Sequence, residues 1–184
     1  MRLYYEIIVE DRQGKIIARL KDEAKSWLKQ YSQMVYGGMS GSAQTLTDIT
    51  GVGRTQSVTY DLMNIWLNAG DDQRGPVVGS GSTPITIEDY KLESQISHGT
   101  GPGQLDHFAN VIIYPSVEGS QCSHQLKKIF HNSSGAPVTV REVGIYCRIS
   151  SAGNACIARD VLPGAVTVPD GGAITLIYSV KAVA

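Results

Sequence analysis

The side chains that could do chemistry are few in this sequence, and they are scattered. The acidic neighbours Asp71–Asp72 and Glu88–Asp89 do not fit the pattern of an EF-hand loop. Neither G-x-S-x-G nor H-E-x-x-H occurs. The histidines, of which the first two flank a glycine-rich loop and are placed to meet in space, lack the spacing of metal ligands; they are His98, His107, His124 and His131. We therefore predict no catalytic residue, no metal site and no cofactor.

Carboxylates offer one enzymatic alternative. A glycoside hydrolase needs two of them facing each other across a cleft, and the candidates here are Glu88, Glu93, Glu118 and Glu142. Nothing in their spacing brings a pair together, so a glycan hydrolase is the weakest of three hypotheses. The glycine-rich stretches "VVGSGSTP" and "HGTGPGQ" lack the G-K-[ST] of a phosphate-binding loop and indicate tight turns with positive φ.

An arginine and a glutamate lie side by side in "PVTVREVGIYCRIS", residues 137–150, which is otherwise rich in β-branched residues. Alternate residues of a strand point to opposite faces, so Val138 and Val140 share one face and the apolar residues of 143–149 share the other. This slip predicts a bulge or a strand break at Arg141–Glu142, which lets both apolar runs face the core. We expect a local kink there to let both charges reach solvent.

The overall composition bounds the function. The chain has 184 residues, enough for one domain or a domain with a small attachment, and its net charge is −1. The absence of a basic excess argues against a nucleic-acid partner. No run of 18 apolar residues predicts a membrane span, and the alternating, acidic start "MRLYYEIIVEDRQG" is unlike a signal peptide, so we expect synthesis in a cytosol. Three irregularly spaced cysteines do not form a disulfide framework.

The first 36 residues predict a β-hairpin followed by a helix. Residues 2–10 alternate, "DRQG" is a turn, and "KIIARL" returns. Within 22–36 apolar residues recur at every third or fourth position, as on one face of an amphipathic helix: Ala24, Trp27, Leu28, Tyr31, Met34 and Val35. Asp22 is placed to cap this helix, and Gly37–Gly38 to end it. We assign residues 1–36 as a docking unit.

The remainder divides into an arm and a β domain. Residues 37–58 are small and polar without a period, which indicates an extended arm or loop. From residue 59 on, short strands alternate with glycine and proline: "VTYDLMNIWLNA", "PVVG", "ANVIIYP", "HQLKKIFHN", "VTVREVGIYCRI", "CIARDVL" and "AITLIYSVKA". They predict a mainly β protein, an antiparallel and jelly-roll-like β-sandwich over residues 59–184. We expect this part to fold without residues 1–58.

Four stretches carry a resemblance to a known group: "VVGSGSTPITIEDYKLESQISHGTG", "FHNSSGAPVTVREVGIYCRI", "CIARDVLP" and "VTVPDGGAITLIYSV". Together they resemble small structural proteins of tailed bacteriophages, in which a "VGxGxT" turn precedes "DYxLE" and a "TVREVGIY" strand precedes "ARDVL". The opening of the chain is similar to the hairpin and helix of such proteins. The resemblance covers most of residues 1–36 and 75–181.

The resemblance implies a non-enzymatic virion protein that assembles in repeated copies on the capsid, as decoration, or on the tail surface. Its partners would be other copies of itself and a major capsid or tail protein. Arg141 and Glu142 belong to the matching motif, which implies that they orient a neighbouring loop or pair across a subunit contact; an intrachain salt bridge at a sheet corner is the alternative. The other candidate interface residues, taken from the helix, are Trp27, Tyr31, Met34 and Tyr36.

A second hypothesis is a tail module that binds carbohydrate on the host surface. β-Sandwiches often carry such sites on loops, where aromatic side chains stack on sugar rings. Aromatic residues make up only 7% of the chain, and the candidates near the glycine-rich loops are Tyr90, Phe108 and Tyr114.

Overall fold

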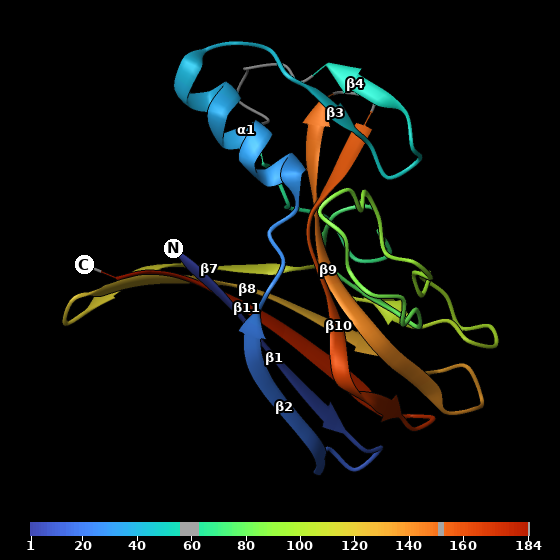
Figure 1. Ribbon diagram of the computed structural model, residues 1–184. Helices are drawn as coiled ribbons and strands as arrows, with labels where there is room; N and C mark the ends of the chain where they lie inside the picture. The colour runs from blue at the N-terminus through green and yellow to red at the C-terminus, as the bar shows by residue number, and fades with distance from the viewer. Residues whose placement is uncertain (56–62, 151–152, 184) are drawn as a thin grey trace.

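The chain folds into an antiparallel β-sandwich with one helix among the residues that the structure describes (Figure 1). This confirms the predicted fold class. The computed structural model describes residues 1–55, 63–150 and 153–183. Its larger sheet has the order β2-β1-β11-β8-β6, and β7 also pairs with β8. The strands of this sheet are β1 (Arg2–Glu10), β2 (Ile16–Ala24), β6 (Asp106–His107), β7 (Val111–Glu118), β8 (Gln121–His131) and β11 (Ala173–Val183).

The smaller sheet has three strands in the order β10-β9-β5. Its strands are β5 (Gly75–Gly79), β9 (Val138–Ser150) and β10 (Gly153–Val168). Helix α1 (Lys29–Ser40) and a small hairpin of β3 (Thr45–Thr47) and β4 (Gly53–Thr55) lie together beyond one end of the sandwich (Figure 1).

The core lies between the two sheets. Strand β1 contributes Leu3, Tyr5, Ile7 and Val9, each at most 3% exposed, because every second residue of the strand faces inward. They join apolar residues of β9 and β11 in one cluster. Strand β1 pairs along its whole length with both β2 and β11, so the N-terminal hairpin is an integral part of the larger sheet.

The helix begins later than predicted. Residues 22–24 complete β2, where Asp22 pairs with Tyr5, and α1 runs over Lys29–Ser40. Pairing with β1 overrides the local helical pattern, since a strand next to a buried strand gains a full ladder of hydrogen bonds. Gly37–Gly38 lie inside the helix; the end is set by Gly41, whose positive φ of 67° lets its N–H donate to the carbonyl oxygen of Gly37 at 3.0 Å.

The predicted arm over residues 37–58 is only partly extended. Its first residues complete α1, and a two-stranded hairpin of β3 and β4 follows. Asp48 fixes the turn of this hairpin by accepting hydrogen bonds from the backbone N–H groups of Thr50 and Val52. The last residues of the predicted arm, 56–58, lie outside the described residues, as do those that start the strand predicted over 58–69; residues 63–69 form no strand.

The predicted irregularity at Arg141–Glu142 is confirmed, and it lies mainly in the partner strand. Val140 of β9 pairs with Val166 of β10, whereas Glu142 pairs with Val161, so four residues of β10 bulge out opposite Arg141. Both apolar runs of β9 therefore reach the same core cluster. The expectation for the charges is right for Arg141, which is exposed, and wrong for Glu142, which is 0% exposed.

Asp160 of β10 gives the first testable prediction. It is 3% exposed; its Oδ1 accepts the N–H of Lys25 at 2.8 Å, and its Oδ2 has no hydrogen-bond partner among the described residues. Burial raises its pKa from 3.8 to about 6. Because its pKa is raised, Asp160 binds a proton more tightly in the folded state than in the unfolded state. Protonated Asp160 therefore contributes stability that is complete below about pH 4 and is lost as the pH rises through about 6.

Asp160→Asn keeps the acceptor for Lys25 and cannot ionise. We expect it to raise the free energy of unfolding at pH 7 by about 2 kcal/mol and to change it little at pH 4. Urea denaturation at pH 4, 5, 6 and 7 measures both. A gain of the same size at all four values would show that ionisation of Asp160 does not cause the effect.

Candidate functional site

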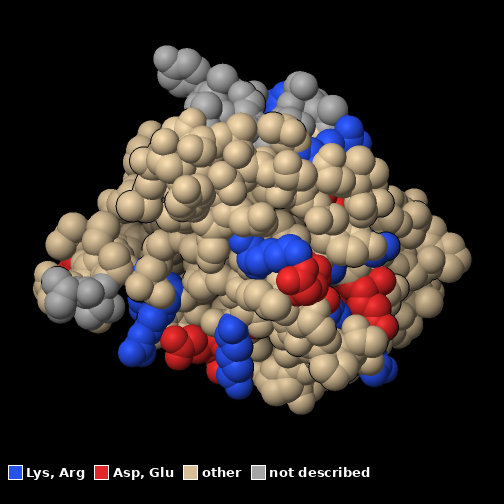
Figure 2. Space-filling view, turned by 45° about the horizontal axis from the view of Figure 1, so that its top comes forward, with Lys and Arg blue, Asp and Glu red and all other residues tan. Residues whose placement is uncertain are grey.

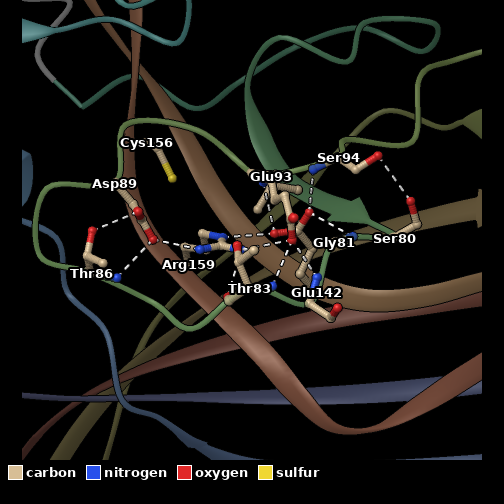
Figure 3. Close-up of polar contacts among 12 residues, drawn as sticks. Ser80, Gly81, Thr83, Thr86, Asp89, Glu93, Ser94, Glu142, Cys156 and Arg159 are labelled. Carbon is tan, nitrogen blue, oxygen red and sulfur yellow. Dashed lines mark hydrogen bonds and ion pairs between the residues drawn. The ribbon is translucent and has the colours of Figure 1, made fainter.

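The residues of the matching motifs converge on one buried arginine, Arg159 of β10 (Figure 3). It lies on the face of the smaller sheet that points away from the sandwich core, beneath the loop of residues 80–94. Beside it a small apolar cluster fills the space between this loop and the sheet; its members are Leu28, Val77, Leu92, Tyr146 and Cys156. The loop therefore has both an apolar and an ionic attachment to the sheet.

The guanidinium group of Arg159 is only 2% exposed and uses its whole donor fork. Its Nε donates to Glu142 Oε2 at 2.8 Å, and its Nη1 donates to Asp89 Oδ2 at 2.6 Å. Its Nη2 donates to the carbonyl and hydroxyl oxygens of Thr83, both at 3.2 Å, and lies 3.9 Å from Glu93 Oε2. Arginine suits this place because its planar fork can serve several acceptors at once.

Glu142 is the second centre of the network. Its Oε1 accepts the backbone N–H groups of Gly81 at 3.1 Å and Ser94 at 2.8 Å, and its Oε2 accepts that of Glu93 at 3.1 Å. One carboxylate thus holds both ends of the loop and is itself paired with Arg159. We define the Arg159 network as Arg159, Glu142, Asp89, Glu93 and Thr83.

The other two carboxylates shape the loop from within. Glu93 Oε2 accepts the N–H groups of Ser82 at 2.6 Å and Thr83 at 2.8 Å, and Asp89 accepts both the N–H and the hydroxyl of Thr86. Backbone groups that would otherwise point into a poorly solvated space are satisfied in this way. Each carboxylate of the network therefore accepts hydrogen bonds that hold the loop in place.

The electrostatics agree with that task. Burial alone would lower the pKa of Arg159, but its hydrogen bonds to Glu142 and Asp89 outweigh burial and raise the pKa above the usual value. For Asp89, burial is likewise outweighed by the hydrogen bonds from Arg159 and Thr86, which lower the pKa. Both groups are held in their charged forms at neutral pH, which suits an ion pair and not a group that exchanges protons with a substrate.

Two glycines allow the start of the loop to approach Glu142 and the loop's other end closely. A Cβ on Gly81 would lie 2.5 Å from Glu142 Oε1 and 2.5 Å from the Cβ of Glu93, and one on Gly79 would lie 2.6 Å from the carbonyl oxygen of Ser94. The "VGSG" stretch is therefore required by packing against a carboxylate, and not by a phosphate group.

A hollow of about 280 Å³ opens next to the network and is lined in part by Tyr90 and Lys91. Three acids lie on its wall: Asp89 and Glu93 are bound to Arg159 or to backbone N–H groups, and Glu88 is paired with Lys29. The hydroxyl oxygen of Tyr146, which does not line this hollow, accepts the N–H of Leu92 at 2.7 Å, and burial raises the pKa of Tyr146. The arrangement can fasten a loop to a sheet; we find no nucleophile paired with a base among these described residues.

The structure separates the two members of the predicted Arg141–Glu142 pair. Glu142 lies in the Arg159 network and orients a neighbouring loop, which agrees with one of the roles implied by the resemblance. The ion pair that it forms is intrachain, with Arg159. Arg141 points to solvent and makes no hydrogen bond or ion pair within the described ranges. A subunit contact by Arg141 stays a prediction.

The four interface candidates from the helix region have different surroundings. Trp27 is half-buried, forms an isolated β-bridge with Ala158 and stacks on Tyr31 with ring centroids 3.9 Å apart. The side chain of Met34 is 1% exposed and packs in the core, so it cannot touch a neighbouring molecule in this conformation. Tyr36 is 56% exposed, and its role in assembly stays a prediction.

Of the four acidic hydrolase candidates, Glu88 and Glu93 line the hollow beside Arg159, and the other two do not. Glu118 lies at the end of β7, whereas Glu93 and Glu142 share the buried Arg159 network. Glu88 forms an ion pair with Lys29. Of the aromatic candidates for glycan binding, Tyr114 is 90% exposed on β7 and Phe108 is 46% exposed, while Tyr90 lines the hollow beside Arg159. They lie on different elements, and glycan binding stays a prediction.

Two histidines meet in space as predicted. The ring centroids of His98 and His107 are 5.8 Å apart. Burial lowers the pKa of His107 to about 3, so its ring is neutral, and it packs against Phe130. Among the described residues no group of three or more His, Cys, Asp or Glu side chains is placed to hold a metal ion.

Two features escaped the sequence reasoning. The sequence motif "ARDVL" contains Arg159 but does not predict its ion pairs, because its partners come from distant segments. Strand β7 was predicted as a strand, but its exposure was not. The sequence holds only a weak signal for Arg159: adjacent opposite charges interrupt each of two apolar strands, at Arg141–Glu142 and at Arg159–Asp160.

Comparisons of the chain with protein-family models, with curated proteins and with solved structures found no match. Within the described part of the chain no helix is long and apolar enough to cross a membrane.

Proposed function

We propose that this chain is a non-enzymatic assembly protein, a structural subunit present in repeated copies on the capsid or tail surface of a tailed-phage virion. The observation that carries the proposal is strand β7. All eight of its residues are exposed, and five are large and apolar: Val111, Ile112, Ile113, Tyr114 and Val117. Exposed apolar surface of this extent in one place typically marks an interaction site.

The shape of the molecule supports a docking role for β7. The hairpin of β7 and β8 projects from the body of the sandwich, and its tip reaches beyond the smaller sheet (Figure 1). An edge strand offers unpaired backbone groups to another chain, and proteins usually protect such edges with charges or short strands. Strand β7 does carry Pro115 and a β-bulge, two further protective devices, but an apolar run precedes them, which favours a partner that covers it.

A second exposed apolar group supports the proposal at the other end of the molecule. On α1, Tyr36 is 56% exposed and Met39 is 84% exposed. Two separate apolar surfaces on one subunit suit a protein that contacts both copies of itself and another virion protein. Contacts that are weak singly are strengthened when they are repeated by symmetry.

The surface charge fits contact with protein. In the view of Figure 2 lysine and arginine side chains lie beside aspartate and glutamate side chains, with wide uncharged areas between them. The net charge is −1. Mixed charges of this kind guide the orientation of protein partners, whereas nucleic-acid binding uses a basic surface.

Particle composition tests the proposed function. Mass spectrometry and electron microscopy of purified virions made by the phage that encodes this chain should find it as a symmetric, repeated component. The control is the same preparation after dissociation and gradient separation, in which the chain should leave the particle fraction. Absence of the chain from purified particles would refute the proposal, and binding of the monomeric protein to a glycan array would favour the carbohydrate-binding alternative.

A further inference from the structure

The pairing of β7 with β8 contains an unusual symmetry. Val111, Ile112 and Ile113 pair with Lys127, Leu126 and Gln125, and Ser116, Val117 and Glu118 pair with Ser123, Cys122 and Gln121. Between these two runs, two residues of β7, Tyr114 and Pro115, lie opposite the single residue His124 of β8. This two-to-one arrangement is a β-bulge.

The bulge makes the two halves of β7 mirror each other in the faces they present. Ile112 is paired with the buried Leu126, so it lies on the core-side face of the sheet, with Val111 and Ile113 on the outer face. Beyond the bulge, Val117 is on the core-side face and Ser116 and Glu118 are on the outer face. The order is outer, core-side, outer on both sides of Tyr114–Pro115.

The unpaired backbone groups follow the same symmetry. Gly119 and Ser120 form the turn between β7 and β8, and the residues that flank such a turn are hydrogen-bonded to each other. Because hydrogen-bonded and outward-pointing residues alternate along an antiparallel strand, Val117 and Ile112 direct their N–H and C=O groups to the free edge. Pro115, which has no N–H to offer, lies in the bulge between them.

We infer that β7 pairs with β7 of a second copy of this chain, antiparallel and edge to edge, around a two-fold axis through the Tyr114–Pro115 bulge. This inference rests on the proposed assembly function and specifies one contact between two copies of the chain. In the resulting register Ile112 lies opposite the second copy's Val117, and Ile113 lies opposite its Ser116. Each pair shares a face of the joined sheet, as opposite residues of an antiparallel ladder must.

Charge complementarity supports a second copy of this chain as the partner of β7. Glu118 at one end of β7 and Lys127 of β8, which is opposite Val111 at the other end, both lie on the outer face of the sheet. An antiparallel two-fold arrangement brings Glu118 of each copy beside the Val111 end of the other, one strand away from Lys127. The lysine stem can span that distance, so two Glu–Lys pairs would flank the contact and fix its direction.

The exposed apolar area of β7 is large enough for a weak contact between two copies. Val111, Ile112, Ile113, Tyr114 and Val117 are 53%, 45%, 43%, 90% and 76% exposed. With full side-chain areas of roughly 150–250 Å², these five residues alone expose on the order of 500 Å² in each copy. Edge-to-edge pairing would cover the strand backbone and only the flanks of these side chains that face the second strand, so two copies would bury less than the ~1,000 Å² of a stable interface and form a weak contact.

Sedimentation of the full chain tests this contact. We expect the wild-type protein to be a dimer at about 100 µM, and the variant Ile112→Lys/Val117→Lys to dissociate at least about 30-fold more readily. Both positions are on the surface, so circular dichroism should show an unchanged fold. The matched control is Tyr36→Lys, an exposed aromatic residue on α1 that should leave the dimer intact.

Cysteine pairs test the register. In a Cys122→Ala background, which removes the exposed free thiol, Ile113→Cys/Ser116→Cys should form a disulfide-linked dimer on oxidation, and Ile113→Cys/Glu118→Cys should not. A monomeric wild-type chain, or a dimer insensitive to the lysine variant, would overturn the inference. The particle experiment is independent, so a chain that is found in virions and yet fails here refutes the β7 contact alone.

Discussion

Replacing Arg159 with methionine is expected to lower the free energy of unfolding by about 3–5 kcal/mol, the usual cost of breaking a buried ion pair by removing one partner. The cost is this large because Glu142, which is 0% exposed, would be left charged with only backbone N–H donors. Chemical denaturation followed by tryptophan fluorescence measures the change.

The matched control for Arg159→Met is Arg141→Met. Arg141 immediately precedes Glu142 in sequence, but it is exposed, so its replacement should change stability by less than about 0.5 kcal/mol. The double variant Arg159→Met/Glu142→Leu removes both charges and should cost less than Arg159→Met and Glu142→Leu added together. If Arg141→Met were as damaging as Arg159→Met, the Arg159 network would not be the cause.

The network also predicts where the damage should appear. Gly81 and Ser94 donate their N–H groups to Glu142, so their amide hydrogen exchange reports on the loop directly. In Arg159→Met these amides should exchange faster than those of β1, which is paired on both sides in the larger sheet. A uniform loss of protection would instead indicate global destabilisation.

What the sequence could predict was local. The phase slip around Arg141–Glu142 is visible within one strand, and it correctly predicts a bulge, because alternation depends only on neighbouring residues. The partner of Glu142 could not be found in this way. Arg159 is 17 residues away, and its position beside Glu142 depends on where the four-residue bulge of β10 falls. The expectation that both charges reach solvent was wrong for Glu142 for that reason.

The start of the helix and the exposure of strand β7 likewise depend on contacts that a local sequence pattern does not reveal. Residues 22–24 carry a helical pattern, but pairing of Asp22 with Tyr5 places them in β2. The run "ANVIIYP" was correctly predicted as a strand, since its residues have high β-propensity. An unbroken apolar run looks the same whether the strand is buried or lies at an exposed edge, so sequence could not reveal that β7 lacks a neighbour on one side.

Removing the first 58 residues should abolish folding, contrary to the expectation from sequence that residues 59–184 fold alone. Deletion takes away β1, whose Leu3, Tyr5, Ile7 and Val9 belong to the core, and it leaves β11 with only one of its two partner strands, β8. At about 1.5–3 kcal/mol for each buried side chain, the loss from these four is roughly 6–12 kcal/mol, as large as the whole stability of an ordinary domain.

The truncated chain should therefore show no cooperative thermal transition and no dispersed amide spectrum. Because such a chain can also fail by aggregating, a point variant gives an independent measure in the full-length protein. Ile7→Ala, at a fully buried position, should cost about 2–5 kcal/mol, and its neighbour Ile8→Ala, on the other face of β1, should cost much less. A cooperative unfolding transition in residues 59–184, together with equal costs at Ile7 and Ile8, would mean that the N-terminal hairpin is an attachment and not a part of the sandwich.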